Sequence, residues 1–105
     1  MEVRAEGDLK ELILTGRSKR YKSVARNPSL MLGLKRAVQI MMSVTRVEEL
    51  STFSYLHYER LKHELSGYSS VRLSNKTVHR LLFIENPDGI TLRLIEIDDT
   101  HYGNK

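Results

Sequence analysis

The feature that most constrains this chain is a change in the spacing of its apolar residues near residue 56. Before that point apolar residues recur every three or four positions, as on one face of a helix. After it they alternate or form short apolar runs, as in strands. Helices followed by strands predict an α+β fold, with two N-terminal helices packed on one face of a twisted antiparallel sheet.

The first helix is predicted over 8–15. Asp8 is expected to cap it, with Glu11 three residues later to complete a capping box. Gly16 follows the last turn and suits the left-handed conformation that ends many helices. The basic residues of 17–22 have no apolar period and predict a loop, either a solvated connector or a contact with RNA phosphates.

The main helix is predicted over 28–44. It begins at Asn27-Pro28, because Asn caps helices well and Pro suits the first helical position. Thr45 and Glu48 are expected to cap a further turn through Leu50. One face of the main helix should be buried, through Leu30, Leu34, Ala37, Val38 and Met41.

Three strands joined by short turns predict an antiparallel meander over 68–73, 78–85 and 90–97. Residues 2–6 are a further candidate strand, and Lys62 is expected on a neighbouring strand just upstream of 68–73. A tight turn at Ser74–Lys76 would pair Leu73 with Thr77 or Val78, which brings Arg72 and Arg80 within about two residue steps.

Composition restricts the possible functions. The 105 residues suit one domain over 1–105, and the formal net charge of +4 favours a polyanionic partner. There is no Cys, the four His lack a zinc spacing, and no Gly-rich phosphate loop occurs, so neither a metal nor a cofactor is expected. No signal peptide and no apolar run of about 20 residues is found, so a soluble, cytoplasmic protein without membrane contact is expected.

Four side chains are candidates for metal-free chemistry on RNA: Lys62, Arg72, Arg80 and His101. Guanidinium and ammonium groups stabilise the charge of a phosphorane, and an imidazole exchanges protons near neutral pH. We expect them to meet on the face of the sheet that carries no helices. Two alternatives stay open: the arginines pair with Glu85, Glu96 or Asp98, or His101 is a surface residue.

Four segments in series resemble HigB toxins of the RelE/ParE superfamily. They are Asp8-Leu9-Lys10-Glu11-Leu12 with Thr15-Gly16-Arg17-Ser18-Lys19-Arg20, then Leu61-Lys62 with Gly67-Tyr68-Ser69-Ser70-Val71-Arg72-Leu73, then His79-Arg80-Leu81-Leu82-Phe83, and finally Ile97-Asp98-Asp99-Thr100-His101-Tyr102.

The resemblance implies the RelE/ParE fold and a ribosome-dependent endoribonuclease that cuts messenger RNA, with a HigA-like helix-turn-helix antitoxin as partner. It implies that Lys62, Arg72 and Arg80 bind the scissile phosphate, and that Asp99 and His101 form a C-terminal catalytic cluster. RNA contacts are further expected from Arg17, Lys19, Arg20, Lys76 and Tyr102.

The chain departs from the family at two places. Thr100 stands where many members have a Tyr, and Tyr102 is a possible replacement that stacks on a base. Glu59 stands where the family often has a His, with His57 and His63 nearby. The alternative functions are a ParE-like gyrase inhibitor, a non-catalytic nucleic-acid-binding module, or an inactive toxin that retains only antitoxin binding.

Overall fold

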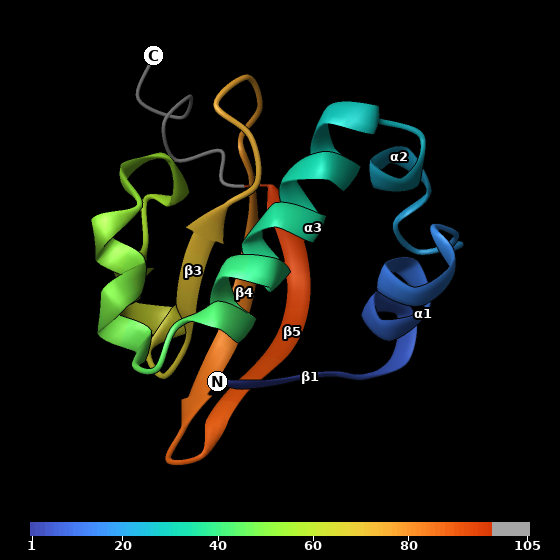
Figure 1. Ribbon diagram of the computed structural model, residues 1–105. Coiled ribbons are helices and arrows are strands. Elements are labelled where there is room, and N and C mark those ends of the chain that lie inside the picture. The colour runs from blue at the N-terminus through green and yellow to red at the C-terminus, as the bar shows by residue number, and fades with distance from the viewer. Residues whose placement is uncertain (98–105) are drawn as a thin grey trace.

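The computed structural model describes residues 1–97 and has helices on one face of a five-stranded sheet (Figure 1). The strands are β1 (Glu2–Ala5), β2 (Glu59–Arg60), β3 (Ser69–Arg72), β4 (His79–Asn86) and β5 (Gly89–Ile97). The helices are α1 (Gly7–Thr15), α2 (Lys22–Ala25) and α3 (Pro28–Ser43), followed by the 3-10 helices η1 (Val47–Thr52), η2 (Ser54–Leu56) and η3 (His63–Leu65).

Helix α1 confirms the predicted end and corrects the predicted start. Gly16 has a φ of 75° and its N–H donates to the Leu12 carbonyl, which ends the helix as expected. The capping role of Asp8 was wrong, because the Lys10 N–H already donates to the Glu6 carbonyl (3.4 Å) and Asp8 lies within the first turn. The basic segment is a loop only as far as Tyr21, since the four-residue α2 begins at Lys22.

Helix α3 begins as predicted and crosses one face of the sheet (Figure 1). The Asn27 side chain accepts a hydrogen bond from the Leu30 N–H at 3.1 Å. The predicted stripe is buried except for Val38, which is partly buried. Met42, next to the buried Met41, is exposed. Gly33 lies so close to β3 that a Cβ atom there would overlap the Leu73 carbonyl.

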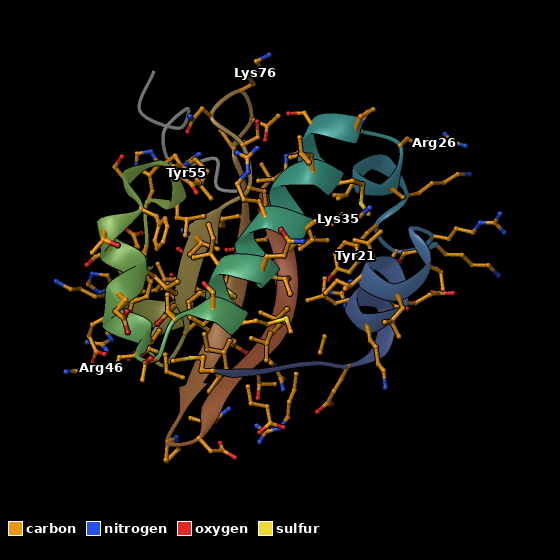
Figure 2. The ribbon with its side chains drawn as sticks, viewed as in Figure 1. Tyr21, Arg26, Lys35, Arg46, Tyr55 and Lys76 are labelled. Atoms are coloured by element: carbon orange, nitrogen blue, oxygen red, sulfur yellow. The ribbon has the colours of Figure 1, made fainter. Side chains whose placement is uncertain are left out.

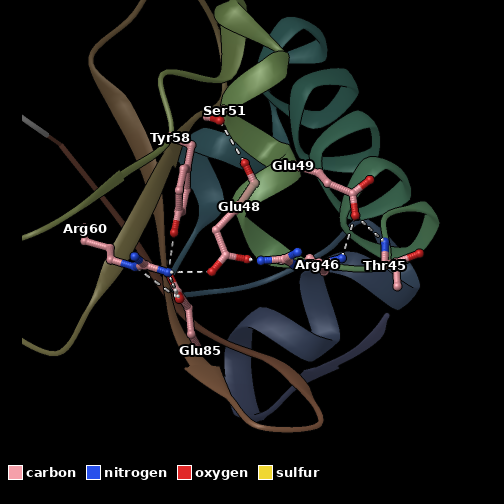
Figure 3. Close-up of polar contacts among 8 residues, drawn as sticks. All are labelled: Thr45, Arg46, Glu48, Glu49, Ser51, Tyr58, Arg60 and Glu85. Atoms are coloured by element: carbon pink, nitrogen blue, oxygen red, sulfur yellow. Dashed lines mark hydrogen bonds and ion pairs between the residues drawn. The ribbon is translucent and has the colours of Figure 1, made fainter.

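The turn after α3 is capped by Glu49 rather than by the predicted Glu48. The Glu49 carboxylate accepts hydrogen bonds from the backbone N–H groups of Thr45 (3.1 Å) and Arg46 (2.7 Å), as Figure 3 shows. Because η1 begins at Val47, Glu49 is its third residue, the position from which a carboxylate reaches back to the chain before the helix.

The sheet has the order β1-β5-β4-β3-β2. Strands β2 to β5 pair antiparallel, which confirms the meander, and β2 is a two-residue edge strand next to β3. The candidate strand at 2–6 is confirmed as β1, but it pairs parallel to β5. Gly89 allows this close approach, since a Cβ atom there would overlap the Glu2 carbonyl.

The core lies between the helices and one face of the sheet. All three α-helices contribute to it, through residues such as Leu9, Val24 and Leu34, and the sheet contributes alternate residues such as Leu81 and Phe83. Leu82 is also buried but is not part of this cluster, because it points to the other face. Within residues 1–97, no helix is long and apolar enough to cross a membrane.

Candidate functional site

Arg72 and Arg80 are directly opposite each other on the neighbouring strands β3 and β4. The expected pairing of Leu73 with Thr77 or Val78 was wrong, because the Leu73 N–H donates to the His79 carbonyl (3.2 Å) and the connection is longer than a tight turn. The shift puts the two guanidiniums on the same face of the sheet, since paired residues of an antiparallel ladder point the same way.

Glu96 extends this pair into a row of three charged residues across β3, β4 and β5. It is paired with Arg80 in the β4–β5 ladder. The row lies on the face opposite the core, because the neighbouring positions Val71, Leu81 and Ile95 belong to the core cluster. This row therefore holds two cations and one anion on the face away from α3.

Hydrogen bonds fix both arginines. Arg80 donates from Nη2 (2.6 Å) and Nε (3.0 Å) to one carboxylate oxygen of Glu96, and its side chain is only 13% exposed. Arg72 donates from Nη1 to the Thr77 carbonyl at 3.3 Å. Of the acidic partners considered from the sequence, Glu96 is thus paired with Arg80.

The next row of this face runs from β2 to β5 and is largely uncharged. It contains Glu59, Ser70, Leu82 and Leu94, each paired with its neighbour. Ser70 and Leu82 are buried, whereas Glu59 is exposed at the edge. Glu59, the residue in the place where HigB toxins often have a His, therefore lies on the same face as the two arginines.

Lys62 lies outside the strand on which it was expected. Strand β2 ends at Arg60, the Leu61 N–H still donates to the Tyr68 carbonyl (2.8 Å), and the chain then turns into η3. The Lys62 side chain is exposed at this edge of the sheet. The β2–β3 pairing puts Arg60 opposite Ser69, so Lys62 lies beyond the start of β3, whereas Arg72 is the last residue of that strand. The structure therefore does not bring Lys62 next to the arginine pair.

Arg17, Lys19 and Arg20 lie at the opposite flank. They are exposed on the connection between α1 and α2, and α1 packs against β5, toward the other edge of the sheet (Figure 1). The Arg20 guanidinium stacks on the Tyr21 ring, 5.2 Å from its centroid. Lys76 projects from the β3–β4 loop (Figure 2). The structure therefore does not gather the basic loop and Lys76 into one place.

The predicted Asp99, His101 and Tyr102 lie outside the described residues. The two histidines near Glu59 are described: both are exposed, and both have left-handed backbones, with φ of 48° at His57 and 61° at His63. Neither histidine lies on the strands that carry the arginine pair, because His57 follows η2 and His63 begins η3.

Sequence reasoning missed Arg93. The β4–β5 register shifts between Leu82 and Phe83, which are paired with Leu94 and Leu92, so Arg93 is an extra residue in β5. It is exposed and lines a groove with Arg20 and Tyr21. No local sequence signal marks such a bulge, because the alternation of apolar residues continues on either side of it.

A second polar cluster, also missed, surrounds Glu85 on the helix-covered face (Figure 3). Its carboxylate accepts hydrogen bonds from Tyr58 Oη (2.6 Å), Ser69 Oγ (2.6 Å) and Arg60 Nη2 (2.9 Å). Glu85 was considered as a partner of Arg72 or Arg80, and that pairing was wrong. Strand β2 brings Arg60 to it, and a two-residue strand leaves no periodic signal.

The charges of this cluster shift its pKa values. Burial and the hydrogen bond to Glu85 raise the pKa of Tyr58 to about 12. Burial alone would raise the pKa of Glu85, but the hydrogen bonds from Arg60, Ser69 and Tyr58 outweigh it and lower that pKa. The Glu85 carboxylate is therefore held ionised and acts as a fixed anchor between β2, β3 and β4.

Among residues 1–97, no three His, Asp or Glu side chains are grouped closely enough to hold a metal ion.

Comparison with known proteins finds similarity in structure. No protein-family model and no curated protein sequence matches the chain. YafQ from E. coli strain BL21(DE3) superposes with a TM-score of 0.58 at 13% identity, covering 97% of this chain and 98% of YafQ. YoeB in the YoeB–YefM complex from Staphylococcus aureus superposes with a TM-score of 0.52 at 16% identity, covering 91% of this chain and 94% of that chain. The chain thus has the RelE-type α+β fold that YafQ and YoeB share.

Proposed function

We propose that this protein is the toxin of a type II toxin–antitoxin system, a cytoplasmic, ribosome-dependent endoribonuclease that cleaves messenger RNA without a metal ion. The observation that carries the proposal is the Arg72–Arg80 pair on the helix-free face of a RelE-type fold. The net charge of +4 and the resemblance of the sequence to HigB toxins support the same function.

The proposed reaction begins with the 2′-hydroxyl of one nucleotide. Its proton is removed, a bond forms from O2′ to phosphorus, the bond from phosphorus to O5′ breaks, and O5′ takes up a proton. Arg72, Arg80 and Lys62 bind the phosphate and stabilise the charge of the phosphorane. His101 transfers the proton and Asp99 orients it. DNA, which lacks the 2′-hydroxyl, is not cleaved by this route.

The partner is proposed to be a HigA-like helix-turn-helix antitoxin. YoeB, which shares the fold, occurs in a complex with YefM, and this supports an antitoxin partner in general. The ribosome and messenger RNA complete the set of proposed partners, as the resemblance to HigB toxins implies.

A non-catalytic RNA-binding module is the second candidate. It is favoured by one observation, the ion pair of Arg80 with Glu96 at 2.6 Å, which offsets the charge of the Arg80 guanidinium. A phosphate must compete with Glu96 for Arg80. Arg80 therefore stabilises a transition state less than an arginine with no carboxylate beside it would.

Controlled expression with mapping of transcript ends separates the candidates. We expect expression of the chain to arrest growth and to produce cuts within translated reading frames, and Arg72→Ala to remove both effects. Arg46→Ala, an exposed arginine far from the pair, is the matched control and should leave both unchanged. Intact transcripts with bound RNA would favour the non-catalytic module, and intact transcripts with broken chromosomes would indicate a gyrase inhibitor.

A further inference from the structure

A shallow groove of about 60 Å³ lies where α3, η2 and the β3–β4 loop meet. Gly33 and Arg36 of α3 form one wall, Tyr55 and Leu56 a second, and the chain from Arg72 to Asn75 the third. The groove exists because Gly33 has no side chain and lets α3 approach the backbone of Leu73. Arg72 therefore belongs both to the arginine pair and to the wall of this groove.

The groove has a stacking surface. Tyr55 is 38% exposed, and the Arg36 guanidinium lies over its ring, 5.7 Å from the centroid. The rings of Phe53 and Tyr55 are in edge-to-face contact, with their centroids 6.3 Å apart and an angle of 78° between the ring planes. This contact fixes the orientation of the tyrosine. Figure 2 shows Tyr55 on the segment beside α3. Aromatic rings and guanidinium planes are the groups on which unpaired bases stack.

The charge of the groove also suits a nucleotide. Arg36 and Arg72 are the charged residues that line it, and none of its described lining residues is a carboxylate. The two larger grooves differ, because one contains Glu48, Glu85 and Asp88 and the other contains Glu6 and Asp8. Asn75 is exposed at the rim, where its amide can donate to or accept from the edge of a base.

We propose that this groove binds an unpaired nucleobase of the RNA, stacked on Tyr55 and Arg36, while Arg72 contacts the phosphate of a neighbouring nucleotide. The inference rests on the proposed function in so far as the ligand is RNA. It adds a subsite on the helix side of the sheet end, and Arg72 joins this subsite to the sheet face on which cleavage is proposed. The groove is shallow, so it holds the face of a base and leaves the sugar in solvent.

The test uses single-stranded RNA that is 2′-O-methylated throughout, so that binding is measured without cleavage. We would compare an intact RNA of about 12 nucleotides with a series in which each position in turn is abasic. One abasic position should weaken binding to the wild-type protein about tenfold. Tyr55→Ala should bind the intact RNA about tenfold more weakly than wild type and should not distinguish that abasic RNA from the intact one. Tyr55→Phe keeps the ring and should behave as wild type.

Two results would overturn the inference. One is that Tyr55→Ala weakens binding of intact and abasic RNA to the same extent, which means that the ring acts only in folding. The other is that the wild-type protein binds all RNAs of the series equally, or binds none of them. Cleavage on ribosomes by the wild-type protein is measured separately, so loss of the groove and loss of the ribonuclease function are told apart.

Discussion

At the scale of single residues, one close contact between α3 and the chain at the end of β3 depends on the absence of a side chain. Gly33 faces the backbone of Leu73, and neither residue can retreat, because α3 is held by buried Leu30 and Leu34 and Leu73 is held by the β3–β4 ladder. The sequence contains no sign of this role, since an isolated Gly in a helix usually indicates only lower helix propensity.

Gly33→Ala should therefore destabilise the protein, although Ala is the better helix former. We expect a loss of about 1–3 kcal/mol, the usual cost of forcing extra volume into a packed contact, measured by urea unfolding. Gln39→Ala, at an exposed position of the same helix, should change stability by less than about 0.5 kcal/mol. Equal stability of Gly33→Ala and wild type would mean that α3 moves away from the strand at no cost.

Glu85 provides a second prediction at this scale. Its pKa is lower in the folded protein than its ordinary value of 4.5, so it favours folding above about pH 4.5. That contribution is lost as the pH falls from 4.5 through the lowered pKa, because the folded state must then take up a proton against Arg60. Thermal unfolding from about pH 7 to about pH 3 should show a steeper loss of stability in wild type than in Glu85→Gln.

The exposed carboxylate of Glu59, which has no ion pair within the described residues, is the control for this titration. Glu59→Gln should keep the acid sensitivity of wild type. If Glu85→Gln lost stability as steeply as wild type on acidification, the hydrogen bonds around Glu85 would not be a source of that sensitivity.

At the scale of elements, the sequence predicts what depends on local chemistry. The start of α3 follows from Asn27 and Pro28, and the end of α1 follows from Gly16. The register of β3 on β4 does not, because it is set by packing across the sheet, and a longer loop replaced the expected tight turn. For the same reason the sequence predicted that Arg72 and Arg80 lie close together, but it did not single out Glu96 as the third member of the row.

Glu96→Gln tests this row. The substitution removes a carboxylate that competes with an RNA phosphate for Arg80, so single-stranded RNA should bind more tightly at low salt. The slope of log K against log salt concentration should become steeper by roughly 0.7, the value for one further phosphate contact on a single strand. Binding is measured by fluorescence anisotropy over a series of salt concentrations.

Glu11→Gln makes the same change of net charge on the exposed surface of α1 and is the control. It should leave the salt slope close to that of wild type. A steeper slope in both variants would show that net charge, rather than the loss of competition for Arg80, is responsible.

At the scale of the whole molecule, most of the cations expected to contact RNA lie on two opposite flanks of the sheet. Lys62, Arg72 and Lys76 lie toward the β2–β3 edge, and the basic loop with Arg17, Lys19 and Arg20 lies beside the β5–β1 edge. This division could not be predicted from sequence order alone, because the residues meet or separate only through the strand order. A structured RNA can touch both flanks at once, whereas one phosphodiester cannot.

The basic loop should accordingly act in capture rather than in cleavage. Replacing Arg17, Lys19 and Arg20 by Ala lowers the formal net charge from +4 to +1, and we expect slower association with ribosomes that depends less on salt. The single-turnover rate of cleavage at saturating protein should be unchanged.

A second triple variant at Arg26, Lys35 and Arg46 has the same net charge and tests whether position matters (Figure 2). If the loop contacts phosphates directly, its variant associates more slowly than the control, whereas equal rates would mean that the loop acts only through overall charge. A lower single-turnover rate would instead make the loop part of the cleavage site.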